Sequence, residues 1–144
     1  MDNGFSMTNR QNKKALKVMI IEDEQDILLL YKDYLISRGH NVLVTATSAL
    51  EIISDYEKIL PDITILDYKL PDNRNGIEAA IKILTTYPSA AILIVTAYDT
   101  VKEEVLKQSI FEGKRFTILF RPIKLAKLEN AIYDILESNN VYHR

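Results

Sequence analysis

The chain has 144 residues, a formal charge of −2, 47% hydrophobic residues and 26% charged residues, which fits a single soluble globular domain. The near-neutral charge argues against general nucleic-acid binding. The absence of cysteine excludes disulfides, thiol catalysis and thiolate metal sites. The two histidines, His40 and His143, lack the spacing of a zinc site. No apolar run is long enough to span a bilayer and Met1–Asn12 holds no apolar signal core, so we expect a cytoplasmic protein without a membrane partner.

Five short apolar stretches are predicted to form strands. We expect them within one domain over residues 17–138, with a flexible tail over 1–16 and a second tail over 139–144. Their residues are β-branched or aromatic and nearly continuous, as in strands covered on both faces. The five stretches are Val18–Ile21, Val42–Val44, Ile63–Leu66, Ala91–Val95 and Phe116–Phe120.

Apolar residues at helical spacing lie between the strands, and each set predicts one buried stripe. The weakest helical segment is Val101–Ile110, where only Val101 and Val105 fall cleanly on one face. The clearer stripes are Ile27, Leu30, Tyr31, Tyr34 and Leu35; Ala49, Ile52, Ile53 and Tyr56; Ile77, Ala80, Ile81 and Leu84; and Leu125, Leu128, Ile132, Ile135 and Leu136.

The order of these elements predicts the fold class. Gly39 follows the first helical segment, where a left-handed C-cap is expected, and Pro61 and Pro88 close the next two. A strand followed by a helix, repeated five times, predicts an α/β fold with a parallel sheet and helices on both faces. Right-handed crossovers then bring the C-terminal ends of the strands to one edge of the sheet.

Acidic residues follow two of the predicted strands. Glu22, Asp23 and Glu24 come directly after the first strand, and Asp67 directly after the third. If these two strands are central neighbours, their carboxylates converge at the rim where open α/β sheets bind ligands. We therefore expect Glu22, Asp23 and Asp67 to line a shallow, polar, solvent-open pocket.

Two interpretations of these acids are open. Grouped carboxylates repel one another unless a cation compensates, and Mg²⁺ takes one or two carboxylates together with waters and phosphate oxygens. A carboxylate beside such an ion can attack a phosphoryl donor. In the simpler interpretation, Glu22, Asp23 and Glu24 complement the dipole of the following helix and Asp67 is a solvated loop acid.

The sequence around the acids resembles that of the receiver domains of two-component response regulators, over roughly Lys17–Ser138. Lys17–Glu24 resembles the family's first strand and acidic pair, and Pro61–Pro71 followed by Asn75–Glu78 resembles its acceptor strand and the next loop. Ile94–Ala97 resembles its fourth strand with the switch hydroxyl. The resemblance implies a signalling switch rather than an enzyme, on a doubly wound, flavodoxin-like five-stranded parallel sheet in the order 2-1-3-4-5.

The resemblance also implies roles for single residues. Asp67 would be the phosphoacceptor in a Mg²⁺-dependent reaction. Asp23 would bind the metal directly, and Glu22, where many members have Asp, would act through a water. Lys69 would offer its backbone carbonyl to the metal, and Thr96 would hydrogen-bond the phosphoryl group. The implied partners are a sensor histidine kinase or a phosphotransfer protein as donor, and a downstream protein whose identity the sequence does not give; a weak homodimer is also open.

The fifth strand departs from the family pattern at its end. The family has a lysine before a proline, whereas this chain has Phe120-Arg121-Pro122. Arginine is a planar, permanently charged fork that pairs readily with carboxylates. We therefore expect a contact between Arg121 and Asp67, direct or through water, that slows phosphorylation. We also expect a cis bond before Pro122, as is typical of the family.

A second departure concerns the aromatic switch residue of the same strand. Counting back from Arg121 gives Ile118, whereas matching the aromatic type gives Phe116. The stretch Gly113–Arg121 is also one residue longer than the family's usual spacing. We interpret Phe116 as a core residue, which puts the family's threonine–aromatic coupling in doubt.

Three functions remain in competition. The first is a phosphorylatable receiver that acts through protein contacts or as a phosphate relay. The second is a receiver-like interaction module whose phosphotransfer is reduced or lost because of Arg121. The third, a nucleotide or flavin site or an aspartate-nucleophile phosphatase, is disfavoured: the four glycines form no phosphate-binding motif, and Lys69 stands where such a phosphatase needs an acid.

Overall fold

The computed structural model describes residues 15–44, 51–69, 75–137 and 140–143. Strands and helices alternate along the chain, as the sequence predicts. None of the helices in this described part is long and apolar enough to cross a membrane. The elements are β1 (Lys17–Ile21), α2 (Gln25–Ser37), β2 (Asn41–Val44), α3 (Ile52–Ile59), β3 (Ile63–Leu66), α4 (Gly76–Thr86), β4 (Ala91–Thr96), α5 (Val101–Leu106), the 3-10 helix η2 (Ser109–Phe111), β5 (Arg115–Phe120) and α6 (Leu125–Leu136).

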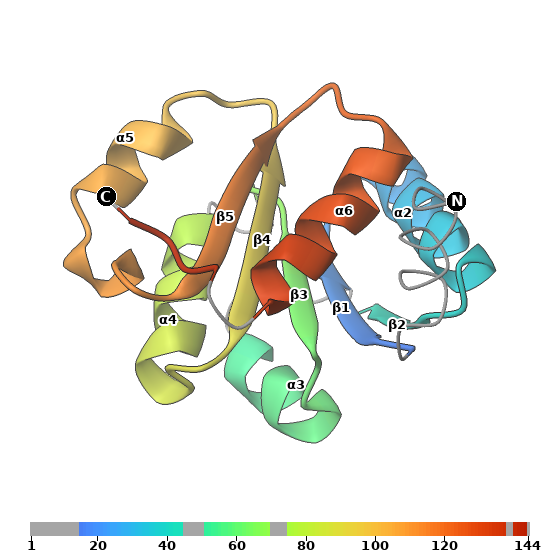
Figure 1. Ribbon diagram of the computed structural model, residues 1–144, viewed down its shortest axis with the longest axis horizontal. Coiled ribbons are helices and arrows are strands. Elements are labelled where there is room, and N and C mark those ends of the chain that lie inside the picture. The colour runs from blue at the N-terminus through green and yellow to red at the C-terminus, as the bar shows by residue number, and fades with distance from the viewer. Residues whose placement is uncertain (1–14, 45–50, 70–74, 138–139, 144) are drawn as a thin grey trace, which may run out of the picture.

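The five strands form one parallel sheet in the order β2-β1-β3-β4-β5, which confirms the flavodoxin-like topology (Figure 1). Helices α2 and α6 cover one face, and α3, α4 and α5 cover the other. β1 and β3 are neighbours in the middle of the sheet, and their last residues, Ile21 and Leu66, are in register. The residues that follow these two strands therefore emerge side by side.

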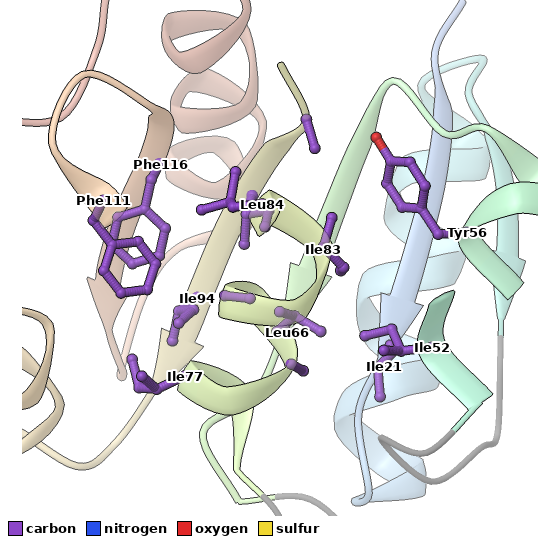
Figure 2. Close-up of a cluster of buried hydrophobic side chains, with 14 of the residues drawn as sticks. Ile21, Ile52, Tyr56, Leu66, Ile77, Ile83, Leu84, Ile94, Phe111 and Phe116 are labelled. Carbon is purple, nitrogen blue, oxygen red and sulfur yellow. The ribbon is translucent and has the colours of Figure 1, made fainter. Parts of the chain in front are cut away.

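Alternate residues of each strand point to opposite faces, and both faces are apolar. Figure 2 shows the cluster on the face covered by α3, α4 and α5, in which Ile21, Leu66 and Ile94 of the sheet lie with side chains of α3 and α4. Val101 and Val105 of α5 belong to the same cluster. Phe116 at the start of β5 is buried there, and its ring centroid is 4.3 Å from that of Phe111. The interpretation of Phe116 as a core residue is confirmed.

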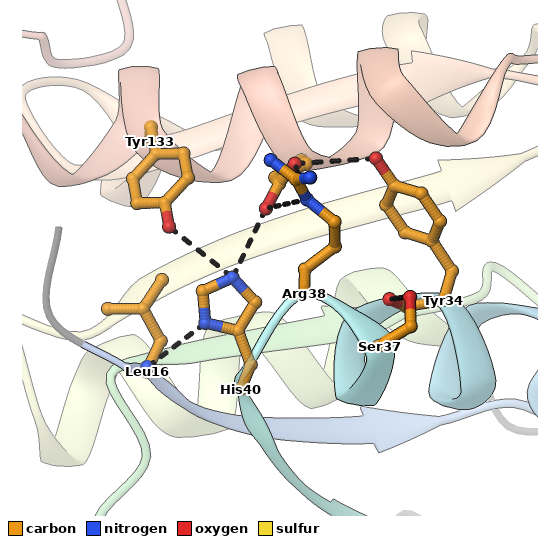
Figure 3. Close-up of polar contacts among 7 residues, drawn as sticks. Leu16, Tyr34, Ser37, Arg38, His40 and Tyr133 are labelled. Atoms are coloured by element: carbon orange, nitrogen blue, oxygen red, sulfur yellow. Dashed lines mark hydrogen bonds and ion pairs between the residues drawn. The ribbon is translucent and has the colours of Figure 1, made fainter. Parts of the chain in front are cut away.

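The opposite face contains a buried polar network between α6 and the end of α2 (Figure 3). The carboxylate of Glu129 accepts two hydrogen bonds from Arg38 Nε, at 3.0 and 3.2 Å, and lies 3.3 Å from His40 Nε2. His40 Nδ1 accepts a hydrogen bond from the backbone N–H of Leu16. An acceptor at Nδ1 requires the tautomer that carries its proton on Nε2, so this N–H faces both Glu129 Oε2 and the hydroxyl oxygen of Tyr133, each at 3.3 Å. The network satisfies a buried carboxylate and ties α6 to the start of the sheet.

Two sequence-based predictions about helices were wrong in detail. Helix α2 buries Leu28, Tyr31 and Leu35, whereas Leu30, which we placed on the buried stripe, is 52% exposed. Because Leu28–Leu30 are all leucine, the pattern alone does not define how the helix is rotated about its axis. The predicted helix over Val101–Ile110 is divided into α5 and η2. Ala49 lies outside the described residues.

Residues 140–143 cross the beginning of β5. The N–H of Tyr142 donates to the carbonyl of Lys114, and the N–H of Gly113 donates to the carbonyl of Tyr142, both at 2.8 Å. The ring of Tyr142 meets Phe116 edge-on, with the centroids 5.4 Å apart. This segment lines a cleft of about 390 Å³ together with β5 and α6.

Helix α3 ends on Leu60, which has a left-handed backbone conformation (φ 48°) and is 58% exposed. This conformation costs a residue with a Cβ atom about 1 kcal/mol, and glycine avoids the cost. We expect Leu60→Gly to raise the free energy of unfolding by roughly 0.5–1 kcal/mol in urea titrations. Leu60→Ala is the control, since it removes the exposed side chain and keeps the strain. Equal stabilities of the two variants would contradict the explanation.

Candidate functional site

The ends of β1 and β3 bring Glu22 and Asp67 together. The N–H of Asp67 donates to the carbonyl of Ile21 at 3.1 Å, which continues the parallel pairing one residue beyond the strands. Both acids are buried: 7% of Glu22 and 5% of Asp67 is exposed. The site therefore lies at the C-terminal edge of the sheet, where parallel α/β folds place ligands.

Arg121 supplies the positive charge for this pair of acids. Its Nη2 atom donates to Asp67 Oδ1 at 2.9 Å and lies 3.6 Å from Glu22 Oε1. The same nitrogen lies 3.4 Å from the carbonyl oxygen of Val95. The predicted Arg121–Asp67 contact is thus confirmed, although one nitrogen makes it rather than the two-pronged fork. The bond between Arg121 and Pro122 is cis, also as predicted.

Asp67 receives a second hydrogen bond at the same oxygen. The backbone N–H of Tyr68 donates to Oδ1 at 2.7 Å. Two N–H donors, one of them charged, therefore meet at Oδ1, and Oδ2 lies outside both contacts.

Glu22 is in the less favourable environment of the two acids. Burial, followed by the nearby charge of Asp67, raises the pKa of Glu22 from 4.5 to about 7. The N–H of Glu24, which donates to Glu22 Oε2 at 3.1 Å, and the charge of Arg121 both lower this pKa, without cancelling the larger effects. One arginine thus balances only part of the charge of two buried carboxylates.

Asp23 differs from the other two acids because its side chain is exposed. The expectation of a solvent-open pocket lined by Glu22, Asp23 and Asp67 was therefore wrong for two of the three residues. Glu22 and Asp67 lie under the Arg121 side chain, of which 17% is exposed. The sequence shows that acids follow the strands, but it does not show which of them a distant arginine covers.

Thr96 and Lys69 flank the acidic pair on different elements. Thr96 is fully buried at the end of β4, and its carbonyl accepts the N–H of Arg121 at 2.8 Å. Its Oγ1 accepts the N–H of Tyr98 at 3.1 Å, which leaves the hydroxyl proton available for donation. Lys69 is exposed, pairs with Asn75 through an isolated β-bridge, and holds its Nζ 5.1 Å from the centre of the Tyr98 ring.

Sequence reasoning missed two residues that shape the site. A Cβ atom at Gly76 would overlap the backbone oxygen of Asp67, and the N–H of Gly76 donates to the carbonyl of Tyr68 at 2.7 Å. Only glycine permits this close approach. The hydroxyl of Tyr68 donates to Glu104 Oε1 on α5 at 2.8 Å. The Asn75-Gly76 pair was a usable signal for the first residue, whereas no local pattern indicates the second.

The donor atoms of the site fit a hard divalent cation in their chemistry. Carboxylate oxygens and a backbone carbonyl are the ligands that Mg²⁺ prefers. Burial, followed by the charge of Asp67, raises the pKa of Glu22, so a cation beside these acids would offset part of the cost of ionising them. The described residues contain no preformed group of three metal-binding side chains. A cation here would have to share the two buried acids with Arg121.

Domains with an open parallel α/β sheet bind ligands at the C-terminal edge of the strands, where the strand order reverses. The acids of this chain lie at that edge, which places it in this class of ligand- or phosphoryl-binding domains. Residues 18–133 match the response regulator receiver domain family, and the chain belongs to this family. It is a receiver domain of two-component signalling, which implies a histidine kinase as partner, and members of the family typically bind Mg²⁺.

Individual relatives agree with this assignment. The chemotaxis protein CheY of Thermotoga maritima is 26% identical over 118 residues, which are 81% of this chain and 96% of that protein. An uncharacterised response regulatory protein of Yersinia pestis is 31% identical over 132 residues, which are 88% of this chain and 52% of that one. The crystal structure of a receiver domain from Clostridium thermocellum has a TM-score of 0.71 at 25% identity, over 85% of this chain and 94% of that one.

The raised pKa of Glu22 makes stability depend on pH. Because its pKa is higher in the folded chain, the folded state favours the protonated form; this stabilisation is complete below pH 4.5 and is lost as the pH rises to about 7. Glu22→Gln keeps the size of the side chain and removes the charge. Allowing for solvent screening, we expect the variant to exceed wild type by roughly 1–2 kcal/mol at about pH 8 and to match it near pH 4.5.

Denaturant titrations across this pH range measure the difference. Glu24→Gln, which changes an exposed acid of the same segment, is the matched control. Its difference in free energy of unfolding from wild type should not change with pH. A difference for Glu22→Gln that does not change with pH would refute the assignment of the charge to Glu22.

Proposed function

We propose that the domain is a phosphoacceptor switch in which Asp67 accepts a phosphoryl group in a Mg²⁺-dependent reaction and thereby changes its protein contacts. The observation that carries the proposal is the position of Asp67 directly after β3, paired with Glu22 and in contact with Arg121. Membership of the receiver family supports it. The donor would be a sensor histidine kinase or a phosphotransfer protein in the cytoplasm, and the target a second protein.

The transfer needs one free carboxylate oxygen. Oδ2 of Asp67, which lies outside the two N–H contacts, would attack the phosphorus atom. The bond from phosphorus to the leaving group then breaks, and the leaving group takes the electron pair. The product is an aspartyl phosphate, and water later attacks the phosphorus to restore the carboxylate.

Other residues would bind the transferring group. Thr96 would donate its hydroxyl proton to a phosphoryl oxygen, since its Oγ1 already accepts from Tyr98. Arg121 would move from Asp67 Oδ1 towards the phosphoryl oxygens. Asp23, Glu22, Asp67 and the Lys69 carbonyl would hold the divalent ion, which when bound would neutralise charge on those oxygens.

The same contact supports the alternative function, an interaction module with reduced phosphotransfer. Arg121 binds the nucleophilic carboxylate and approaches Glu22, so its charge competes with any metal ion for the same two acids. Lysine is a compact point charge, whereas the guanidinium is broad and weakly hydrated, which favours a lasting contact with a carboxylate. The two functions differ in how fast Asp67 is phosphorylated.

Labelling with acetyl phosphate and Mg²⁺, followed by intact-mass measurement, separates them. We expect wild type to be labelled roughly ten- to a hundredfold more slowly than Arg121→Lys, because the charge-assisted contact between Arg121 and Asp67 must be given up to reach the transition state. Arg115→Lys, at the other end of β5, is the matched control and should match wild type. Asp67→Asn should remain unlabelled.

Each other outcome has a distinct meaning. Equal rates for wild type and Arg121→Lys would mean that arginine replaces lysine fully. A label on Asp67→Asn would show that another residue is the acceptor. If neither wild type nor Arg121→Lys is labelled, the interaction module is favoured.

Metal binding is a separate prediction. We expect weak binding of Mg²⁺, seen as chemical-shift changes in an NMR titration, or of Mn²⁺, seen as broadening of nearby signals, because few protein ligands hold a reluctantly dehydrated ion. Asp23→Ala and Asp67→Ala should abolish it. Asp26→Ala, an exposed acid in the first turn of α2, is the control. Unchanged binding in the first two variants would disprove the ligand assignment.

A further inference from the structure

Tyr68 connects the acidic site to helix α5. Its backbone N–H donates to Asp67 Oδ1 at 2.7 Å, and its hydroxyl donates to Glu104 Oε1 at 2.8 Å. The ring lies between these two bonds and contacts the Tyr98 ring, with the centroids 5.8 Å apart. One residue thus reaches from the Asp67 carboxylate to a carboxylate on another element.

The backbone around Tyr68 is held on both sides. The Tyr68 carbonyl accepts the N–H of Gly76 at 2.7 Å, and the Gly76 backbone lies so close to the Asp67 oxygen that a Cβ atom would overlap it. The peptide between Asp67 and Tyr68 therefore has little room, and its orientation determines where the phenol ring points. A change of hydrogen bonding at Asp67 Oδ1 acts directly on this peptide.

Helix α5 depends on tertiary contacts for its position. It has six residues and no side-chain hydrogen bond at its N-cap, and a helix of this length is unstable alone in water. Val101 and Val105 are its buried residues. The hydrogen bond from Tyr68 to Glu104 adds a polar contact on a charged acceptor, and it is the largest cause that raises the pKa of Tyr68.

We propose that the hydrogen bond from Tyr68 to Glu104 couples the state of Asp67 to the position of α5, with Tyr68 as the positioning residue; phosphorylation as the natural trigger rests on the proposed function. When the Asp67 carboxylate is converted to an acyl phosphate or to an amide, its carbonyl oxygen carries less negative charge, and the hydrogen bond from the Tyr68 N–H weakens. A small rotation of this constrained peptide then moves the phenol hydroxyl away from Glu104, and α5 loses one of the contacts that position it.

Amide hydrogen exchange of α5 tests the coupling without phosphorylation. The variants are Asp67→Asn, Tyr68→Phe and the double variant. Tyr68→Phe keeps the ring and removes only the hydroxyl. We expect each single variant to speed exchange of the α5 amides about three- to tenfold, the effect of one lost hydrogen bond. In the double variant, Asp67→Asn should add little, because the link is already broken.

Two controls make the result specific. Tyr87, at the C-terminal end of α4, has a hydroxyl that is hydrogen-bonded to Glu57. Tyr87→Phe removes this hydroxyl and should leave the hydrogen exchange of α5 unchanged. Glu104→Ala breaks the link from the side of the helix with a good helix-forming residue, and it should reproduce Tyr68→Phe. If Asp67→Asn speeds α5 exchange equally with and without the Tyr68 hydroxyl, the coupling is disproved.

The acetyl-phosphate state then separates this proposal from the proposed function. Labelled wild type should show the faster α5 exchange, and labelled Tyr68→Phe should show no further change. If the chain takes no label but the comparison of wild type with the two single variants and the double variant shows the coupling, phosphoacceptance fails and the coupling stands. If labelling proceeds while α5 exchange in Tyr68→Phe equals that of wild type in both states, the coupling fails and phosphoacceptance stands.

Discussion

Two buried carboxylates share one arginine, and the functional edge of this domain depends on that imbalance of charge. Glu22 and Asp67 are neighbours because β1 and β3 are parallel and in register up to their last residues. Arg121 reaches them from the end of β5 and donates to only one. Burial, followed by the charge of Asp67, raises the pKa of Glu22 to about 7; Arg121 offsets only part of this, so the site retains a need for more positive charge.

This imbalance explains how one location supports two functions. A divalent cation would supply the missing charge, as expected of a working receiver. A guanidinium that stays on Asp67 supplies part of it permanently and, under the proposed function, holds the carboxylate that would be phosphorylated. The two states differ by the exchange of one charge-assisted contact for another, which is a difference of a few kcal/mol. The acids can bind either the divalent cation or the guanidinium. The residue at position 121 therefore influences the balance between these two states more than the acids do.

The sequence predicted the features that follow from strand order and strand ends. The sheet and the meeting of Glu22 with Asp67 follow once the parallel pairing is known, whereas the Arg121–Asp67 contact was expected from the resemblance to the receiver family and from the chemistry of arginine. It did not predict the rotation of α2, because three consecutive leucines allow more than one buried stripe. Nor did it predict the burial of the acids or the bond from Tyr68 to Glu104, since both depend on residues far apart in the chain.

The position of Phe116 bears on how a change at Asp67 travels through this domain. Phe116 pairs with Ile92 and packs on Phe111 near the start of β5, whereas Thr96 pairs with Phe120 at the strand's other end. The buried aromatic ring of β5 is therefore four residues from the threonine's register, and a coupling between them is not available through direct contact. Tyr68, adjacent to Asp67 in the chain and bonded to α5, offers a shorter path. The proposed path from Asp67 to α5 therefore runs through Tyr68 rather than through β5.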